Sequence, residues 1–252
     1  MSKLLGASLP VLATLITGCA VVSDDPVSPP ATAEHAVAAP SATAGLPHGC
    51  VALADNQAVT LDLEAETITP TPDFMLVGDV SSLGMTQNHL VACGSWNGTL
   101  QILDQVTGQT TTVDLPCEGV TTIGDKVYVQ SLLQNSLHEY ADLRALIAKT
   151  PTRALTAPYA SRIGAGNGRL IASWHSADEV LAVDLETSTS TAIPLPGYDG
   201  WIFGLFENAS VRLVAGGWVE TGINIYDTQS GQQVGRLFDG VWLGGLTCPT
   251  AP

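Results

Sequence analysis

A pattern that recurs about every 41 residues is the feature that most constrains the fold of this chain. Apolar segments end in an aspartate that is followed by polar turn residues; the aspartates are Asp62, Asp104, Asp142, Asp184 and Asp227. They follow one another at intervals of 42, 38, 42 and 43 residues, with Asp142 as the most degenerate copy. Self-similarity at a period of roughly 20–50 residues indicates copies of one supersecondary unit that stack on each other.

Two further series run in register with the aspartates. Leu90, Leu170 and Leu213 begin apolar segments, each 14 residues before its aspartate. Aliphatic residues beside a glycine recur at intervals of 40, 40, 42 and 41, at Leu83, Ile123, Ile163, Leu205 and Leu246. Each repeat is therefore predicted to hold four short strands: an inner one, a second, a third that ends at the aspartate, and an outer one.

Repeats of this kind predict an all-β fold, a single five-bladed β-propeller of four-stranded blades over residues 46–252. The glycines of the inner series are expected where strands crowd a central axis. The last repeat, "LGGLTCP", has an inner strand only, whereas the first, residues 49–69, has outer strands only. The C-terminal strand should therefore pair with the N-terminal part of the domain and close the ring. Residues 136–155 have room for one short helix.

The turn in "LDQVTGQTTTVDL" resembles the broad group of YVTN-type and quinoprotein-like propeller repeats, and the likeness extends over residues 49–248. This resemblance implies the fold and leaves the function open, because such propellers serve many functions. Quinoprotein enzymes are far larger than this chain, so their cofactor is not carried over and no cofactor is expected.

The first 18 residues have the character of a signal peptide. Lys3 precedes about fourteen mostly apolar residues, too few to cross a hydrocarbon core of ~30 Å comfortably. The segment ends in Ile16, Thr17, Gly18 and Cys19, which resembles the lipobox of bacterial lipoproteins. That resemblance implies cleavage before Cys19 and diacylglycerol on its sulfur, and so a membrane-anchored protein in the periplasm or at the cell surface. An ordinary secretory signal with a chance cysteine is the alternative.

Composition separates a tether from the domain. Residues 19–45 are rich in Pro, Ala, Ser and Thr and lack apolar periodicity, which is typical of a flexible spacer. The whole chain has 9 Lys and Arg against 24 Asp and Glu, a net charge of −15. Such a charge repels phosphate backbones, so nucleic acid is not expected as a partner.

Four cysteines follow Cys19, and an even number in an exported chain favours two disulfides. The register of the repeats puts Cys50 and Cys248 on adjacent antiparallel strands, within the ~4.4–6.8 Å α-carbon separation that a disulfide needs. A Cys50–Cys248 bond would lock the closure of the ring. By subtraction, Cys93 pairs with Cys117.

All five tryptophans map to one face of the predicted propeller, together with Tyr159, His175, Arg162, Asp79, Glu118, Asp199 and Asp239. An aromatic-rimmed bowl on this face would suit an unknown small molecule, a glycan or a protein. The alternative is that the rings pack between blades. Trp201 and Trp242 occupy equivalent repeat positions, which favours packing; the hairpin tips, Trp96, Trp174 and Trp218, favour binding.

No hydrolase, phosphoryl-transfer or redox motif is present, and the inner strands have almost no acidic residues. The leading hypothesis is a non-enzymatic binding protein, with no catalytic residue and no metal site. A carbohydrate-active propeller enzyme is one alternative, which would need converging carboxylates. An exported zinc carrier using His35 and His48 is the other.

Overall fold

The computed structural model describes residues 45–55, 57–75, 80–94, 99–131, 136–156, 162–173, 178–217 and 221–249. These residues form short β-strands joined by tight turns, and they include one short helix, α1 (Leu143–Ile147). The prediction of an all-β chain with a short helix in the third repeat is confirmed. Within these ranges, no helix has the length and apolar character needed to span a membrane.

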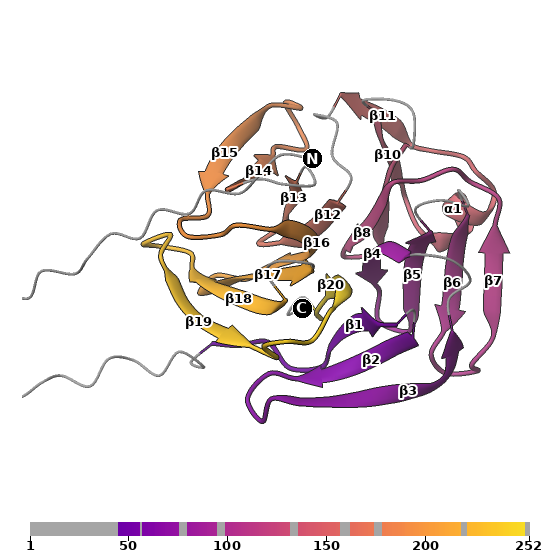
Figure 1. Ribbon diagram of the computed structural model, residues 1–252. Coiled ribbons are helices and arrows are strands. Elements are labelled where there is room, and N and C mark those ends of the chain that lie inside the picture. The colour runs from indigo at the N-terminus through magenta and orange to yellow at the C-terminus, as the bar shows by residue number, and fades with distance from the viewer. Residues whose placement is uncertain are drawn as a thin grey trace, which may run out of the picture. The chain divides into compact units, whose positions relative to one another are not determined.

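The strands make three four-stranded sheets and one eight-stranded sheet (Figure 1). The first sheet has the order β20 (Gly244–Thr247), β1 (Cys50–Ala54), β2 (Gln57–Asp62) and β3 (Thr67–Met75). The second has β4 (Val80–Met85), β5 (His89–Gly94), β6 (Leu100–Asp104) and β7 (Thr110–Val113). The third has β8 (Gly119–Ile123), β9 (Lys126–Gln130), β10 (Ser136–Tyr140) and β11 (Arg153–Thr156). The eight-stranded sheet has β15 (Ser190–Pro194), β14 (Glu179–Val183), β13 (Arg169–Ser173), β12 (Arg162–Gly166), β16 (Trp201–Glu207), β17 (Val211–Gly217), β18 (Gly222–Asp227) and β19 (Gln233–Leu237).

The repeated aspartates hold the turns between third and fourth strands. The Oδ1 atom of Asp104 accepts hydrogen bonds from the backbone N–H groups of Val106 at 2.8 Å and Thr107 at 3.1 Å. Asp184 accepts equivalent bonds in its own turn, both at 2.8 Å. These carboxylates accept hydrogen bonds from turn N–H groups that have no partner in the strand pairing. Asp142 differs, because it caps α1 by accepting from the Ala145 N–H at 2.7 Å.

The innermost strands contact one another in the order β4, β8, β12, β16 and β20, and β20 contacts β4 (Figure 1). Glycine permits the closest of these approaches: a Cβ atom on Gly164 or Gly166 would overlap the carbonyl oxygen of Leu205 or Glu207. There β12 and β16 pair in parallel and join two groups of four strands into one sheet. Gly124 departs from the predicted crowding, because it has open space around it and a φ of 60° in the turn between β8 and β9.

Five apolar clusters of described residues each fill the space between two successive groups of four strands. In one of them, Cys50 and Leu61 of the first sheet pack with Leu213 and Ile225 of the eight-stranded sheet. The last group of strands is therefore packed on the first, and the core is distributed around a closed cycle.

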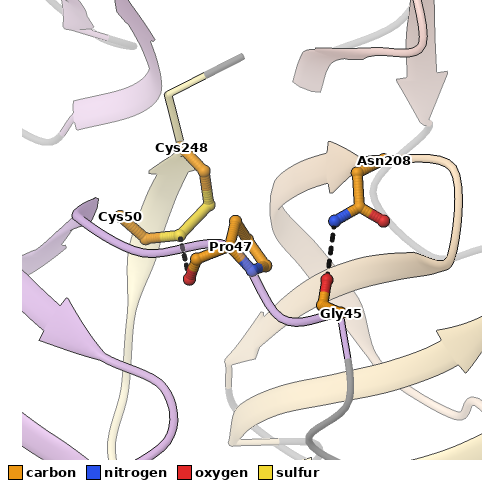
Figure 2. Close-up of a disulfide and its surroundings, with 5 residues drawn as sticks. All are labelled: Gly45, Pro47, Cys50, Asn208 and Cys248. Atoms are coloured by element: carbon orange, nitrogen blue, oxygen red, sulfur yellow. Dashed lines mark hydrogen bonds between the residues drawn. A yellow bond between two sulfur atoms is a disulfide. The ribbon is translucent and has the colours of Figure 1, made fainter. Parts of the chain in front are cut away.

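The C-terminal strand closes this cycle as predicted. β20 pairs antiparallel with β1, with Val51 opposite Thr247 and Ala52 opposite Leu246. Next to this pairing, Cys50 and Cys248 form a disulfide with their α-carbons 4.0 Å apart (Figure 2).

The second predicted disulfide is also present. Cys93 in β5 is bonded to Cys117, which lies just before β8, with 6.0 Å between the α-carbons. Two buried disulfides are typical of a protein that folds outside the reducing cytoplasm.

Candidate functional site

Three aromatic side chains gather where β16 begins, and we call Trp201, Phe203 and Trp242 the aromatic cluster. Phe203 is buried, whereas 40% of Trp201 and 43% of Trp242 remain exposed. The Trp201 ring stacks on Phe203 with 6.3 Å between centroids, and the Trp242 ring meets Phe203 edge-on at 5.8 Å. Such offset and edge-to-face geometries are the ones that aromatic rings prefer. The cluster therefore presents two partly exposed indoles on a buried phenyl ring.

Hydrogen bonds fix the backbone on both sides of the aromatic cluster. The Tyr198 hydroxyl donates to the Trp201 carbonyl oxygen at 2.8 Å. Next to Trp242, the Val241 carbonyl oxygen accepts from the Gly222 N–H at 2.8 Å. Both indoles are thus attached to ordered segments, which lowers the entropy that binding would cost.

A buried cation lies against the aromatic cluster. The guanidinium carbon of Arg162, at the start of β12, is 5.1 Å from the Phe203 ring centroid, a cation–π distance. Burial lowers the pKa of Arg162 to about 10, and the nearby Glu118 carboxylate partly offsets this. Arg162 therefore stays protonated at neutral pH beneath an apolar surface.

The structure brings together four of the residues proposed from the sequence: Trp201, Trp242, Arg162 and Glu118. Trp201 and Trp242 were expected to favour packing between blades, yet both rings are partly exposed while they also contact Phe203. Six other predicted residues lie outside the described ranges: Asp79, Trp96, Tyr159, Trp174, His175 and Trp218.

Sequence reasoning missed Phe203, which joins the two indoles. Phe203 follows Trp201 by two residues, but the register of β16 shifts between Ile202 and Gly204, so strand alternation carried no reliable signal for this contact. Asp199 is exposed, and Asp239 forms an ion pair with Arg236 at 3.0 Å, so neither carboxylate belongs to the aromatic cluster.

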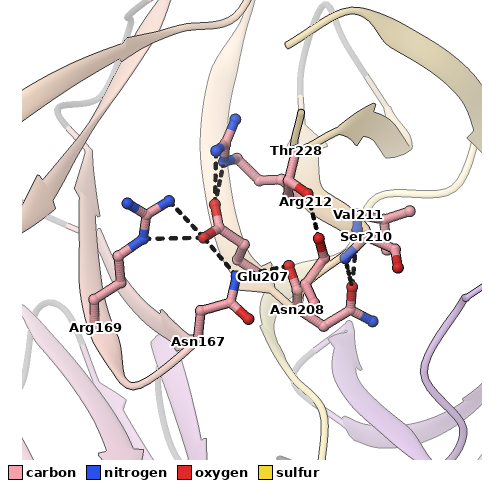
Figure 3. A network of polar contacts seen from close by, with 9 residues as sticks. Asn167, Arg169, Glu207, Asn208, Ser210, Val211, Arg212 and Thr228 are labelled. Carbon is pink, nitrogen blue, oxygen red and sulfur yellow. Dashed lines mark hydrogen bonds and ion pairs between the residues drawn. The ribbon is translucent and has the colours of Figure 1, made fainter. Parts of the chain in front are cut away.

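The buried carboxylates are held by cations. Glu207, at the end of β16, accepts from Arg212 at 2.8 and 2.6 Å and from Arg169 at 3.0 and 2.6 Å (Figure 3). Glu139 on β10 is held in the same way by Lys126 and Arg153. These pairs were not predicted, although Arg169 and Arg212 each precede a leucine of the 14-residue series.

Among the residues that the structure describes, no group of three or more His, Cys, Asp or Glu side chains is placed to hold a metal ion. His48 is exposed, and His35 lies outside the described ranges.

Solved structures resemble this chain in fold. A protein of unknown function from Bacteroides caccae aligns with a TM-score of 0.53 and 9% identity over 80% of this chain and 98% of its own, which shows the fold alone. Glutaminyl cyclase of Myxococcus xanthus aligns with a TM-score of 0.49 and 16% identity, over 68% of this chain and 71% of its own. Hydrazine synthase of Kuenenia stuttgartiensis aligns at 0.44 and 14%, over 64% of this chain, which spans 50% of that one. At these scores the last two likenesses do not bear on function.

Neither a protein-family model nor a curated protein matches the sequence.

Proposed function

We propose that residues 46–252 form a five-bladed β-propeller. The eight-stranded sheet divides into two groups of four strands, and the described pairs that join them are Ala165–Phe206 and Gly166–Glu207. With the other three sheets these groups make five units, and five apolar clusters fill the spaces between neighbours. The cyclic contacts of the innermost strands support the same count.

We propose further that the chain is an exported lipoprotein, anchored through Cys19 with residues 19–45 as a tether. The lipobox resemblance and the two disulfides support this proposal. Two or more acyl chains hold a protein firmly, since each buried CH₂ contributes ~0.8 kcal/mol. We expect full-length protein to incorporate labelled palmitate and to sediment with membranes, and Cys19→Ser to lose both properties. Membrane attachment that survives Cys19→Ser would contradict the anchor.

The propeller is proposed to bind a small molecule, a glycan or a protein at its Trp-rich face without catalysing a reaction. The observation that carries this proposal is the partial exposure of Trp201 and Trp242 on either side of buried Phe203. Tryptophan is one of the residue types enriched among those that dominate binding energy at interfaces. The net charge of −15 favours neutral or cationic partners.

Paired substitutions at this face test the proposal. The native lipidated protein, immobilised in neutral detergent, is incubated with envelope extract of its own cells and with a panel of neutral oligosaccharides. We expect saturable binding that Trp201→Ala with Trp242→Ala weakens at least tenfold. The matched control is Ile147→Ala, which truncates a partly exposed apolar residue on α1, far along the chain from the aromatic cluster.

Thermal unfolding of the same variants separates a binding surface from a core. Because both indoles are partly exposed, Trp201→Ala and Trp242→Ala should each lose less unfolding free energy than Phe203→Ala, for which about 3–5 kcal/mol is expected. Binding that is equal in the double variant and the Ile147→Ala control would overturn the binding proposal, whatever their stability.

A further inference from the structure

A cavity lies away from the aromatic cluster, between the third sheet and the β12–β15 half of the eight-stranded sheet. Its volume is about 360 Å³, and its wall includes Lys126, Tyr128, Arg153 and Arg169. The whole chain has only 9 Lys and Arg against 24 Asp and Glu. Three of these few cationic side chains line this one cavity.

Buried Glu139 orients two of these cations. It accepts from Lys126 Nζ at 2.9 Å and from Arg153 Nε and Nη2 at 3.0 and 2.8 Å. Burial alone would raise the pKa of Glu139, but the hydrogen bonds from Lys126 and Arg153 lower it, so the carboxylate stays ionised. Both cations are therefore positioned before any ligand arrives.

Buried Glu207 orients the third cation in the same way. Its Oε1 atom accepts from Arg169 Nε and Nη2, while Oε2 is taken by Arg212 (Figure 3). Both cavity arginines thus use Nε and Nη2 for the carboxylate and keep Nη1 outside that pair. Four cations surround the two buried carboxylates, and three of them, Lys126, Arg153 and Arg169, line the cavity.

Tyr128 completes the polar part of the wall. Burial, together with the nearby Glu139 charge, raises the pKa of its phenol to about 12. The hydroxyl therefore remains protonated at physiological pH, and its proton is engaged in a hydrogen bond with the Glu139 carboxylate.

We propose that this cavity binds a small oxyanion, a carboxylate or a phosphate, on Lys126, Arg153 and Arg169. Carboxylates and phosphates accept hydrogen bonds from guanidinium and ammonium groups. In Arg153 and Arg169, Nη1 lies outside the bonds to the buried carboxylates. The exposed carboxylates of Asp184 and Glu186 also line the cavity, and Asp184 Oδ1 is already engaged by its turn. Their charge opposes an anion, so we expect modest affinity.

The cavity lies close to the point where the described chain begins. The Gly45 carbonyl oxygen accepts from Asn208 at 2.8 Å (Figure 2), and the Asn208 carbonyl oxygen accepts from Asn167 at 2.7 Å. Asn167 directly precedes Gly168 and Arg169 of the cavity wall. For a protein anchored as proposed, the oxyanion has two sources that the test must distinguish: a dissolved anion or a lipid headgroup.

Calorimetric titration of the native lipidated protein in neutral detergent, at constant ionic strength, tests the site with inorganic phosphate. Lys126→Met is the main variant, since Arg153 still pairs with Glu139. Lys149→Met is its matched control, because 50% of the Lys126 side chain and 47% of the Lys149 side chain are exposed. We expect saturable binding that Lys126→Met weakens at least fivefold and Lys149→Met changes less than twofold.

Glu186→Gln should act in the opposite direction and tighten phosphate binding two- to fivefold, because it removes a repelling charge. The proposal would be overturned if phosphate, acetate and glycerophosphoglycerol all failed to show saturable binding. Equal effects of the two lysine variants on phosphate binding would also overturn it.

Two further ligands in the same titration identify the source. Acetate tests a simple carboxylate, and glycerophosphoglycerol tests the deacylated headgroup of phosphatidylglycerol. Tighter binding of glycerophosphoglycerol than of phosphate, lost in Lys126→Met, assigns a lipid headgroup. Tighter binding of phosphate or acetate assigns a dissolved anion.

Discussion

The repeated aspartates show how one side chain sets a turn and its response to acid. Hydrogen bonds from backbone N–H groups lower the pKa of Asp104 and Asp184, and bonds from the Ser230 side chain and backbone lower the pKa of Asp227. Each carboxylate is thus more acidic in the folded chain than its ordinary value of 3.8. By linkage, these turns add stability above that value and lose it as the pH falls through the lowered pKa.

Acid unfolding measures this contribution. We expect stability to fall less steeply between pH 4 and pH 2 when Asp104, Asp184 and Asp227 are all replaced by Asn, which keeps an acceptor oxygen but does not titrate. Asp114→Asn is the control, since that exposed carboxylate makes only a 3.9 Å pair with Lys149. A slope equal to that of the native protein would show that these turns do not set the acid response.

At the level of elements, the sequence predicts what depends on local periodicity. The four-strand unit and the Asp turns follow from the register of the repeats, because strands that are neighbours in sequence form hairpins. The Cys50–Cys248 pairing follows from the same register, because the incomplete last repeat supplies the inner strand that the first repeat lacks. Ser188 and Glu66 fit the same turns with φ of 57° and 51°, at the position where Gly108 and Gly231 stand in other copies. The short helix α1 lies in residues 136–155, the stretch that departs from the repeat and was predicted to have room for one, and its cap is the most degenerate aspartate, Asp142.

The repeat pattern does not predict which side chains contact each other between different groups of strands. Glu207 meets Arg169 38 residues earlier in the chain, and Arg162 meets Phe203 of another strand group. Such contacts depend on how two groups of strands are rotated and shifted against each other, and the pattern within one repeat does not carry that information. The cavity beside Glu139 and Glu207 was missed for the same reason.

For the molecule as a whole, the disulfide that closes the ring is expected to contribute more to the free energy of unfolding than the other one. The chain-entropy model relates stabilisation to loop length, and the two loops span 198 and 24 residues. It gives about 5 kcal/mol for Cys50–Cys248 and about 3 kcal/mol for Cys93–Cys117.

Two double serine variants, one for each disulfide, test this ranking by denaturant unfolding. We expect the Cys50/Cys248 variant to lose about 2 kcal/mol more free energy of unfolding than the Cys93/Cys117 variant. The reverse order would mean that local packing around β5 and β8, rather than closure of the cycle, governs the loss.

The attachment of the first described residues also sets how the domain would respond to a pull. Force applied to the chain ahead of Gly45 first meets the Asn208 hydrogen bond and buried Leu46. A few residues later it reaches Cys50, whose disulfide passes the load directly to Cys248 beyond the last strand. A pulling force on the tether is therefore shared between β1 and β20. While the disulfide is intact, β1 cannot be separated from β20 one hydrogen bond at a time.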